Sequence, residues 1–168
     1  NLLVDTILAS LLGFGSISYL YFADRIAQLP LGIIGIALGT TLLTSLSKST
    51  AIKDANQFSK ELIISFKIGL FFSIPAAAVF INFSDILIKS LFERGEFSFQ
   101  ETMQTSNALI AYAIGIPAFI MLKSCQPAFL AEGNTKTPMY IGFILLILNI
   151  VLSFSLMTYL KHVGIALA

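Results

Sequence analysis

The stretch ADRIAQLPLGIIGIALGTTLLTSLS, residues 23–47, decides how this chain is built. It opens with a charged pair, Asp24 and Arg25, and continues as an apolar run dotted with glycines. Because about 20 apolar residues suffice for a helix to cross a bilayer, the stretch predicts a membrane-spanning helix. A charged pair at the start of such a span is costly unless it faces a watery cavity or a ligand. Arg25 is therefore the strongest functional candidate in the sequence.

The composition indicates an integral membrane protein. Hydrophobic residues make up 57% of the chain and charged residues only 11%, whereas soluble domains average about 25% charged residues. The net charge of +1 gives no indication of nucleic-acid binding, and we expect none. The single cysteine, Cys125, excludes an internal disulfide, and its apolar surroundings favour an inert thiol. Since the chain begins and ends in apolar sequence, we interpret it as an internal piece of a longer membrane protein.

The predicted fold class is all-α, a polytopic transmembrane helical bundle with about four to five spans. The first segment is too short to cross a bilayer, and we interpret it as the visible part of a span. Residues 16–23 are typical of an interfacial aromatic belt. Pro30 predicts a kink or a restart of the second helix. The expected spans cover residues 1–12, 24–46, 61–83, 106–122 and 139–160.

Two further patterns concern packing and orientation. Gly32, Gly35 and Gly39 fall on one helical face, where a smooth surface lets a neighbouring helix approach closely in lipid. The connections at residues 47–60 and 123–137 lie on the same side of the membrane, because two spans separate them. They hold five lysines, so the positive-inside tendency places them in the cytoplasm.

Three polar residues stand in otherwise apolar segments: Asp5, Asn149 and Ser153. Asp5 must find a partner, an ion, a proton or water, or else lie near an interface. Asn149 and Ser153 share a helical face at i and i+4, and an asparagine there can simply hydrogen-bond between helices. If Asp5 and Asn149 converge, their oxygens suit a small hard cation such as sodium.

No constellation of enzyme residues is present, so we expect a protein that is not an enzyme. The chain has one histidine and one cysteine, no glycine-rich phosphate loop, and no pair of carboxylates on one predicted helix face. His162, at the end of the last span, is most simply an interfacial residue. Metal coordination by His162 and Cys125 is disfavoured for lack of further ligands.

Arg25 differs from these residues in kind. Its guanidinium keeps its proton and matches phosphate oxygens in a two-pronged fork. It can instead pair with Asp24 or extend to the lipid headgroups. Successive helical residues point about 100° apart, so Asp24 and Arg25 do not simply face each other. An anionic ligand and a purely structural role both remain open at this point.

The chain resembles the MurJ (MviN) lipid II flippases along essentially its whole length. The resemblance is carried by ordered motifs: NLLVDTILAS (1–10), GSISYLY (15–21), ADRI (23–26), LPLG (29–32), GIALGT (35–40), LFERG (91–95), AYAIG (111–115), PAF (127–129), KTP (136–138) and HVG (162–164). The resemblance implies a two-lobed helical fold of the multidrug/oligosaccharidyl-lipid/polysaccharide exporter superfamily. This chain would be part of the C-terminal lobe, without the N-terminal lobe.

The resemblance also implies a function. Such proteins move lipid II, the undecaprenyl-diphosphate-linked peptidoglycan precursor, across the bacterial cytoplasmic (inner) membrane by alternating access, for cell-wall synthesis. Arg25 matches an arginine of the central cavity and would contact the diphosphate, with Asp24 and Gln28 beside it. Gln28 stands where some relatives carry an acidic residue, and Ser153 where many carry Asn or Asp, which weakens an ion site built with Asn149.

The resemblance further implies lipid II, membrane lipids and the N-terminal lobe as partners. We expect no cofactor, but coupling to Na⁺ or to the membrane potential, since moving one charge across 100 mV costs about 2.3 kcal/mol. Two alternatives stay open. One is an exporter of drugs or polysaccharide-linked lipids, which would not rescue peptidoglycan synthesis. The other is a non-transporting membrane scaffold, in which Arg25 would be dispensable.

Overall fold

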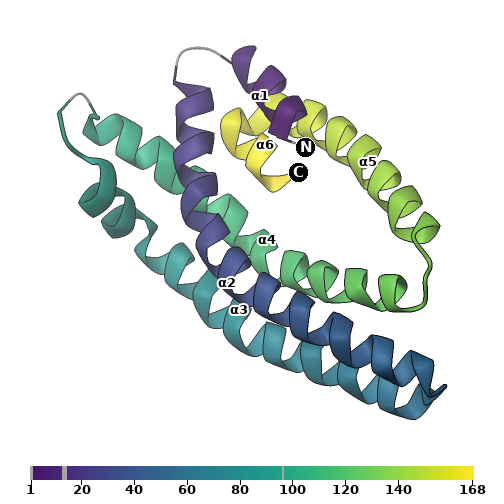
Figure 1. The fold of residues 1–168 in the computed structure, drawn as a ribbon. Helices are drawn as coiled ribbons and strands as arrows, with labels where there is room; N and C mark the ends of the chain where they lie inside the picture. The colour runs from purple at the N-terminus through teal and green to yellow at the C-terminus, as the bar shows by residue number, and fades with distance from the viewer. Residues whose placement is uncertain (1, 13–14, 96) are drawn as a thin grey trace. The chain divides into compact units, whose positions relative to one another are not determined.

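A computed structural model of the chain describes residues 2–12, 15–95 and 97–168, with side chains from Thr6 onward. The described residues form helices and connections without any strand. The helices are α1 (Leu2–Ser10), α2 (Ser16–Ala51), α3 (Ala55–Phe92), α4 (Phe99–Ala131), α5 (Lys136–Leu160) and α6 (His162–Leu167). Figure 1 shows their course. Four of them, α2 to α5, are long and apolar enough to cross a membrane, which confirms the polytopic all-α prediction.

The four long helices, α2 to α5, are longer than the predicted spans. α2 begins at Ser16 and ends at Ala51, so the expected interfacial segment and part of the expected polar loop are helical. Near the end of α2, Thr50 Oγ1 donates to the Leu46 carbonyl at 2.9 Å, so this polar side chain bonds back into the helix. α3 continues to Phe92, with a break in helical geometry at Phe83 (φ −123°, ψ 16°).

Short capped turns replace the long loops that the sequence predicted. Side chains accept hydrogen bonds at or near the first turn of α3, α4 and α5, as N-caps do. Asp54 Oδ1 accepts from the backbone N–H of Gln57, at 2.9 Å, at the start of α3. Asn134 Oδ1 does the same for Thr137 at 3.1 Å, at the start of α5. At the start of α4 the Ser98 N–H donates to the Glu101 carboxylate at 2.6 Å.

The chain divides into two compact units. Unit 1 comprises Asn1–Gln28, Ala77–Gly115 and Ile144–Ala168, and unit 2 comprises Leu29–Ala76 and Ile116–Phe143. Three helices pass from one unit to the other within two residues of a proline: Pro30 in α2, Pro75 in α3 and Pro117 in α4. Each proline removes one helical hydrogen bond, so these helices bend most easily there. α2 nevertheless continues through Pro30 without a restart.

Unit 1 has a core of small and aliphatic side chains. α1 packs against α6, as Figure 1 shows. The α2 residues in the core occupy one face of its first half, and alanines there permit close helix contacts. The buried core residues are Leu8, Ala9, Leu20, Ala23, Ile26, Ala27, Ile88, Ala108, Leu109 and Ile165.

A tight corner joins α5 to α6 within unit 1. Lys161 adopts a positive φ of 53°, and Gly164 lies so close to Leu156 that an added Cβ would be 2.5 Å from the Leu156 carbonyl oxygen. His162 is buried, with Nε2 3.1 Å from the Gln104 carbonyl oxygen, so its ring packs against protein at the end of the last span. Burial lowers the pKa of His162, and the Lys161 charge adds to this, while the hydrogen bond to Gln104 opposes it. The buried ring is therefore neutral at pH 7.

Unit 2 contains a helical hairpin of α2 and α3, which run side by side in Figure 1. Ser49 Oγ on α2 donates to Glu61 Oε1 on α3 at 3.3 Å. At Gly69 on α3 a Cβ would lie 3.0 Å from Ile120 Cγ2 on α4 and 3.3 Å from Leu38 Cδ1 on α2, so the side chains of both helices pack closely there.

The glycine stripe of α2 does not mediate the predicted close helix approach. Among the described residues no atom of another helix lies within 4 Å of a Cβ added at Gly32 or Gly39. Gly35 meets only the side chain of Lys123, at 3.8 Å. The prediction of a glycine-mediated helix contact along this face is therefore wrong for the described part of the chain.

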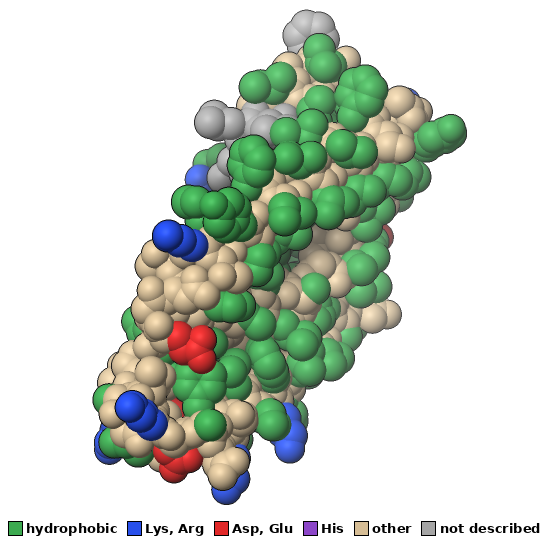
Figure 2. All heavy atoms as spheres, turned by 90° about the vertical axis from the view of Figure 1, so that its right-hand side faces the viewer, with side chains coloured by type: hydrophobic (Ala, Val, Ile, Leu, Met, Phe, Trp, Pro, Cys, Tyr) green, Lys and Arg blue, Asp and Glu red, His purple; other side chains and the backbone are tan. Residues whose placement is uncertain are grey.

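The surface is predominantly apolar, as a membrane-embedded protein requires. Hydrophobic side chains cover most of the face shown in Figure 2, with few charged side chains among them. α5 is the least buried of the long helices, with Phe143 and Phe154 each about 60% exposed. Exposed apolar side chains of this extent would be unfavourable in water but are stable against lipid.

Candidate functional site on the first half of α2

The candidate site is a polar face on the first half of α2, within unit 1. Tyr21, Asp24, Arg25 and Gln28 occupy positions i, i+3, i+4 and i+7, which share one side of a helix. Tyr21, Arg25 and Gln28 are exposed and Asp24 is half-buried. The opposite side of the same turns is buried in the core of unit 1. Burial of the apolar side thus holds this part of α2 in the core of unit 1, and the polar side lies at the surface of the unit.

Asp24 and Arg25 each have a different neighbour on this face. Gln28 Nε2 donates to Asp24 Oδ2 at 2.5 Å. The guanidinium carbon of Arg25 lies 4.9 Å from the centroid of the Tyr21 ring. Among the described residues Arg25 forms no ion pair within 4.0 Å, so the alternative in which Asp24 neutralises it by direct contact is not what the structure shows.

This arrangement leaves an anion-binding group available. Arg25 keeps its charge at any physiological pH. The guanidinium carbon lies over the Tyr21 ring, and its N–H groups form no hydrogen bond or ion pair with the described residues, so they are available to a ligand. A free cation in a membrane-spanning helix requires water or an anion beside it. The face is therefore suited to a carboxylate or phosphate ligand.

The second group of candidates lies on α5. Asn149 is 7% exposed and Ser153 is fully buried, one helical turn apart in unit 1. Asn149 Oδ1 and Ser153 Oγ have no hydrogen-bond partner among the described residues. A buried polar group left unpaired costs about 1–3 kcal/mol, so these oxygens are candidates for an unseen ligand. The side chain of Asp5 lies outside the described residues, so its convergence with Asn149 stays a prediction.

The structure also shows polar contacts that sequence reasoning missed. The Ser106 hydroxyl on α4 donates to the Asp85 carboxylate on α3. Its oxygen also lies 2.7 Å from Ser84 Oγ on α3. The residues are more than 20 positions apart, so no local pattern could have indicated the contact. The contact of Tyr21 with Arg25 was missed too, although their i and i+4 spacing is a usable signal.

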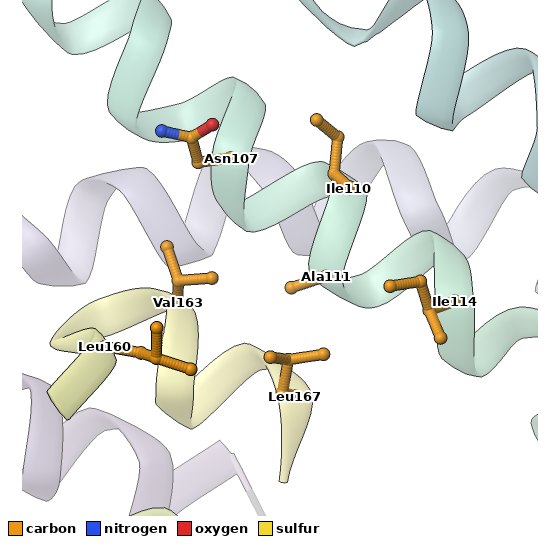
Figure 3. A pocket seen from close by; sticks show the side chains of 7 residues that line it. All are labelled: Asn107, Ile110, Ala111, Ile114, Leu160, Val163 and Leu167. Atoms are coloured by element: carbon orange, nitrogen blue, oxygen red, sulfur yellow. The ribbon is translucent and has the colours of Figure 1, made fainter. Parts of the chain in front are cut away.

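A separate hollow in unit 1 contains none of the predicted site residues. It measures about 270 Å³ and is bounded by side chains of α4 and α6 together with the end of α5. Figure 3 shows Val163 and Leu167 facing α4 across it. Its lining is apolar except for Asn107: Asn107, Ile110, Ala111, Ile114, Leu160, Val163 and Leu167. Such a lining suits an apolar chain rather than a charged headgroup.

The fold and the site define a multi-pass α-helical membrane protein with an arginine exposed on one spanning helix, without an ion-pair partner among the residues that the structure describes. A family model described as "Lipid II flippase MurJ" matches residues 1–168. The chain belongs to this family, whose members named here are bacterial, and it is a multi-pass protein of the bacterial inner membrane.

Individual relatives agree with this assignment. The chain is 39% identical over 168 residues to the "Probable lipid II flippase MurJ" of Rhizobium meliloti, covering 100% of this chain and 31% of the relative. It is 40% identical over 166 residues to the protein of the same name from Rickettsia prowazekii, covering 99% and 32%. A solved structure, "Lipid II flippase MurJ, inward closed conformation", superimposes with a TM-score of 0.88 at 33% identity, covering 98% of this chain and 34% of that one. The chain thus spans about a third of the length of these relatives.

Proposed function

We propose that this chain forms part of the substrate site of a flippase that moves lipid II across the bacterial cytoplasmic membrane for cell-wall synthesis. Family membership and the names of the relatives support this substrate. The observation that carries the proposal is the guanidinium of Arg25, exposed on the polar face and without an ion-pair partner among the described residues.

The polar face provides a physical basis for binding a diphosphate. Arg25 donates two N–H groups to phosphate oxygens in a forked arrangement, which binds an anion more strongly than a neutral donor does. The Asp24 carboxylate would repel the phosphates. Gln28 Nε2, however, donates a hydrogen bond to this carboxylate, so a donor group lies against the negative charge. Because Gln28 is neutral, it adds no second negative charge beside Arg25. This combination favours an anionic headgroup.

Transport would proceed by alternating access, with this part of the protein working against an N-terminal lobe that lies outside the chain. The headgroup would occupy a hydrated cavity beside Arg25 while the lipid tail stays in the bilayer. The test is whether the complete protein restores peptidoglycan synthesis in cells depleted of their own flippase. Failure of rescue with normal membrane insertion would favour an exporter of other lipids or a scaffold.

We further propose that Asn149 and Ser153, with Asp5, bind a sodium ion that is coupled to transport. The unpaired Asn149 Oδ1 and Ser153 Oγ support this, because both are buried oxygens that a hard cation prefers. A bound sodium ion would supply a positive charge that compensates a buried carboxylate. Such a site would link the movement of an anionic headgroup to the ion gradient.

Replacing Asn149 with alanine removes one proposed sodium ligand. A loss of about 1.4 kcal/mol of binding free energy weakens affinity tenfold, so the sodium concentration for half-maximal transport is expected to rise about tenfold or more. Transport by the complete protein in vesicles, measured against sodium at constant ionic strength, provides the readout. Asn82→Ala is the matched control, because Asn82 is exposed and donates to the carbonyl of Ala78 in its own helix. An unchanged sodium response in both Asn149→Ala and Asp5→Ala would exclude the ion site.

A further inference from the structure

We propose that Tyr21 is a positioning residue for Arg25: its ring holds the guanidinium so that the N–H edge meets the phosphates of the substrate. This proposal rests on the proposed function of Arg25. The two side chains are one helical turn apart, and the guanidinium carbon lies 4.9 Å from the ring centroid. This separation lies within the range of about 6 Å over which a cation is attracted to an aromatic face.

The direction of the contact follows from helix geometry. Side chains in a helix tilt toward the N-terminus, so a long side chain at position 25 lies over the turn that contains position 21. Arg25 therefore lies against the Tyr21 ring instead of extending freely, and it loses side-chain freedom before a ligand arrives. Ordering a long side chain in advance reduces the entropy cost of binding.

The Tyr21 ring is itself held in place by other aromatic side chains of unit 1. It makes an edge contact with Phe22, with ring centroids 5.9 Å apart. Phe22 in turn packs against Phe92 at the end of α3, at 4.7 Å, and against Phe97 in the following connection, at 5.6 Å. The aromatic support, which consists of these four rings, thus links Arg25 to two further segments of unit 1.

The same contact also separates Arg25 from its acidic neighbour. Asp24 attracts Arg25 through charge, and a salt bridge between them would occupy the donors that a phosphate needs. The contact with Tyr21 holds the guanidinium of Arg25 against the preceding turn of the helix. Gln28, in the following turn, donates a hydrogen bond to the Asp24 carboxylate. The ring is therefore expected to act through Arg25, without touching the substrate itself.

The experiment compares variants of the complete flippase that contains this chain, at matched membrane insertion. Tyr21→Phe keeps the ring and is expected to bind lipid II as the parent protein does. Tyr21→Leu removes it and is expected to raise the KM for lipid II about 2- to 5-fold, the value of an exposed cation–π contact, with kcat retained. Tyr159→Leu is the matched control, because Tyr159 is 85% exposed and lies in the same unit. It is expected to change neither constant.

A second arm separates positioning from a general effect on folding. In an Arg25→Ala background, Tyr21→Leu should cause no further loss of lipid II binding, because the ring then has no guanidinium to hold. Tyr21→Met replaces Tyr21→Leu if the latter fails to insert. The inference is overturned, and the proposed function stands, if Tyr21→Leu binds normally while Arg25→Ala does not. It is also overturned if Tyr21→Phe loses as much as Tyr21→Leu. Normal lipid II binding by Arg25→Ala would overturn the proposed function itself.

Discussion

Replacing Arg25 with alanine in the complete flippase is expected to abolish rescue of cells depleted of their own lipid II flippase. Each hydrogen bond to a charged group contributes about 1.5–3 kcal/mol, so losing a two-pronged contact should weaken lipid II binding roughly 100-fold or more. Arg25→Lys keeps the charge but loses the fork, and should be impaired by about tenfold. Growth on depletion and lipid II binding in detergent are the two measurements.

The control for this experiment is the other arginine of the chain. Arg94 is exposed in the connection after α3, and its Nη2 donates to the Ser90 carbonyl at 3.5 Å. Arg94→Ala removes the same charge and is expected to support growth. If Arg25→Ala inserts normally and still rescues growth, the chain acts in some way that does not need Arg25, and the scaffold alternative gains support.

Replacing Gly164 with alanine is expected to destabilise the folded protein by about 1–3 kcal/mol, as overpacking of a close-packed site does. The added Cβ would lie 2.5 Å from the carbonyl oxygen and 2.6 Å from the carbonyl carbon of Leu156. These are backbone atoms, so the clash cannot be relieved by rotating a side chain. The corner between α5 and α6 would have to open, which would disturb the burial of His162 and Ile165 beside it.

The measurement is the thermal unfolding midpoint in detergent, together with the fraction of protein inserted in the membrane. Gly142→Ala is the control, because in the described part of the chain no atom beyond the neighbouring α5 backbone lies within 4 Å of a Cβ at that position. Alanine is favoured over glycine inside a helix, so this control should melt at the parent temperature or slightly above it. A Gly164→Ala protein that melts with the control would show that the corner is not closely packed.

The helical class and the four long apolar helices could be predicted from sequence, because apolar runs of membrane length have few alternatives in a bilayer. Their ends could not be. Residues such as Ser49 and Thr50 are polar and resemble a loop, yet their hydroxyls bond to carbonyls of the preceding turn and extend α2. The prediction that a neighbouring helix packs closely on the glycine face of α2 was wrong for a related reason. Spacing shows which residues share a face, but it does not show what packs against that face.

Some features of the candidate sites could likewise be predicted from sequence and others could not. The grouping of Arg25, Asp24 and Gln28 on one side of α2 was predictable, because charged and polar residues are rare in this chain and local spacing places them together. The burial of Asn149 and Ser153 was predictable only in part, since a polar residue in an apolar span can face lipid, protein or water. The neighbours of His162 were not predictable, because its contacts with Gln104 and Tyr19 join residues distant in sequence.

The proposed function requires that the polar face of α2 borders water inside the membrane, and thiol labelling tests this most directly. Cys125 is the single cysteine of this chain, so the complete protein, with Cys125 and every cysteine outside the chain replaced by serine, provides a background for Gln28→Cys and for Ala27→Cys, whose position is 3% exposed. A membrane-impermeant thiol reagent should modify Gln28→Cys readily, lipid II should slow the reaction, and Ala27→Cys should stay unmodified. If Gln28→Cys is as unreactive as Ala27→Cys, the face does not border water and the central claim is contradicted.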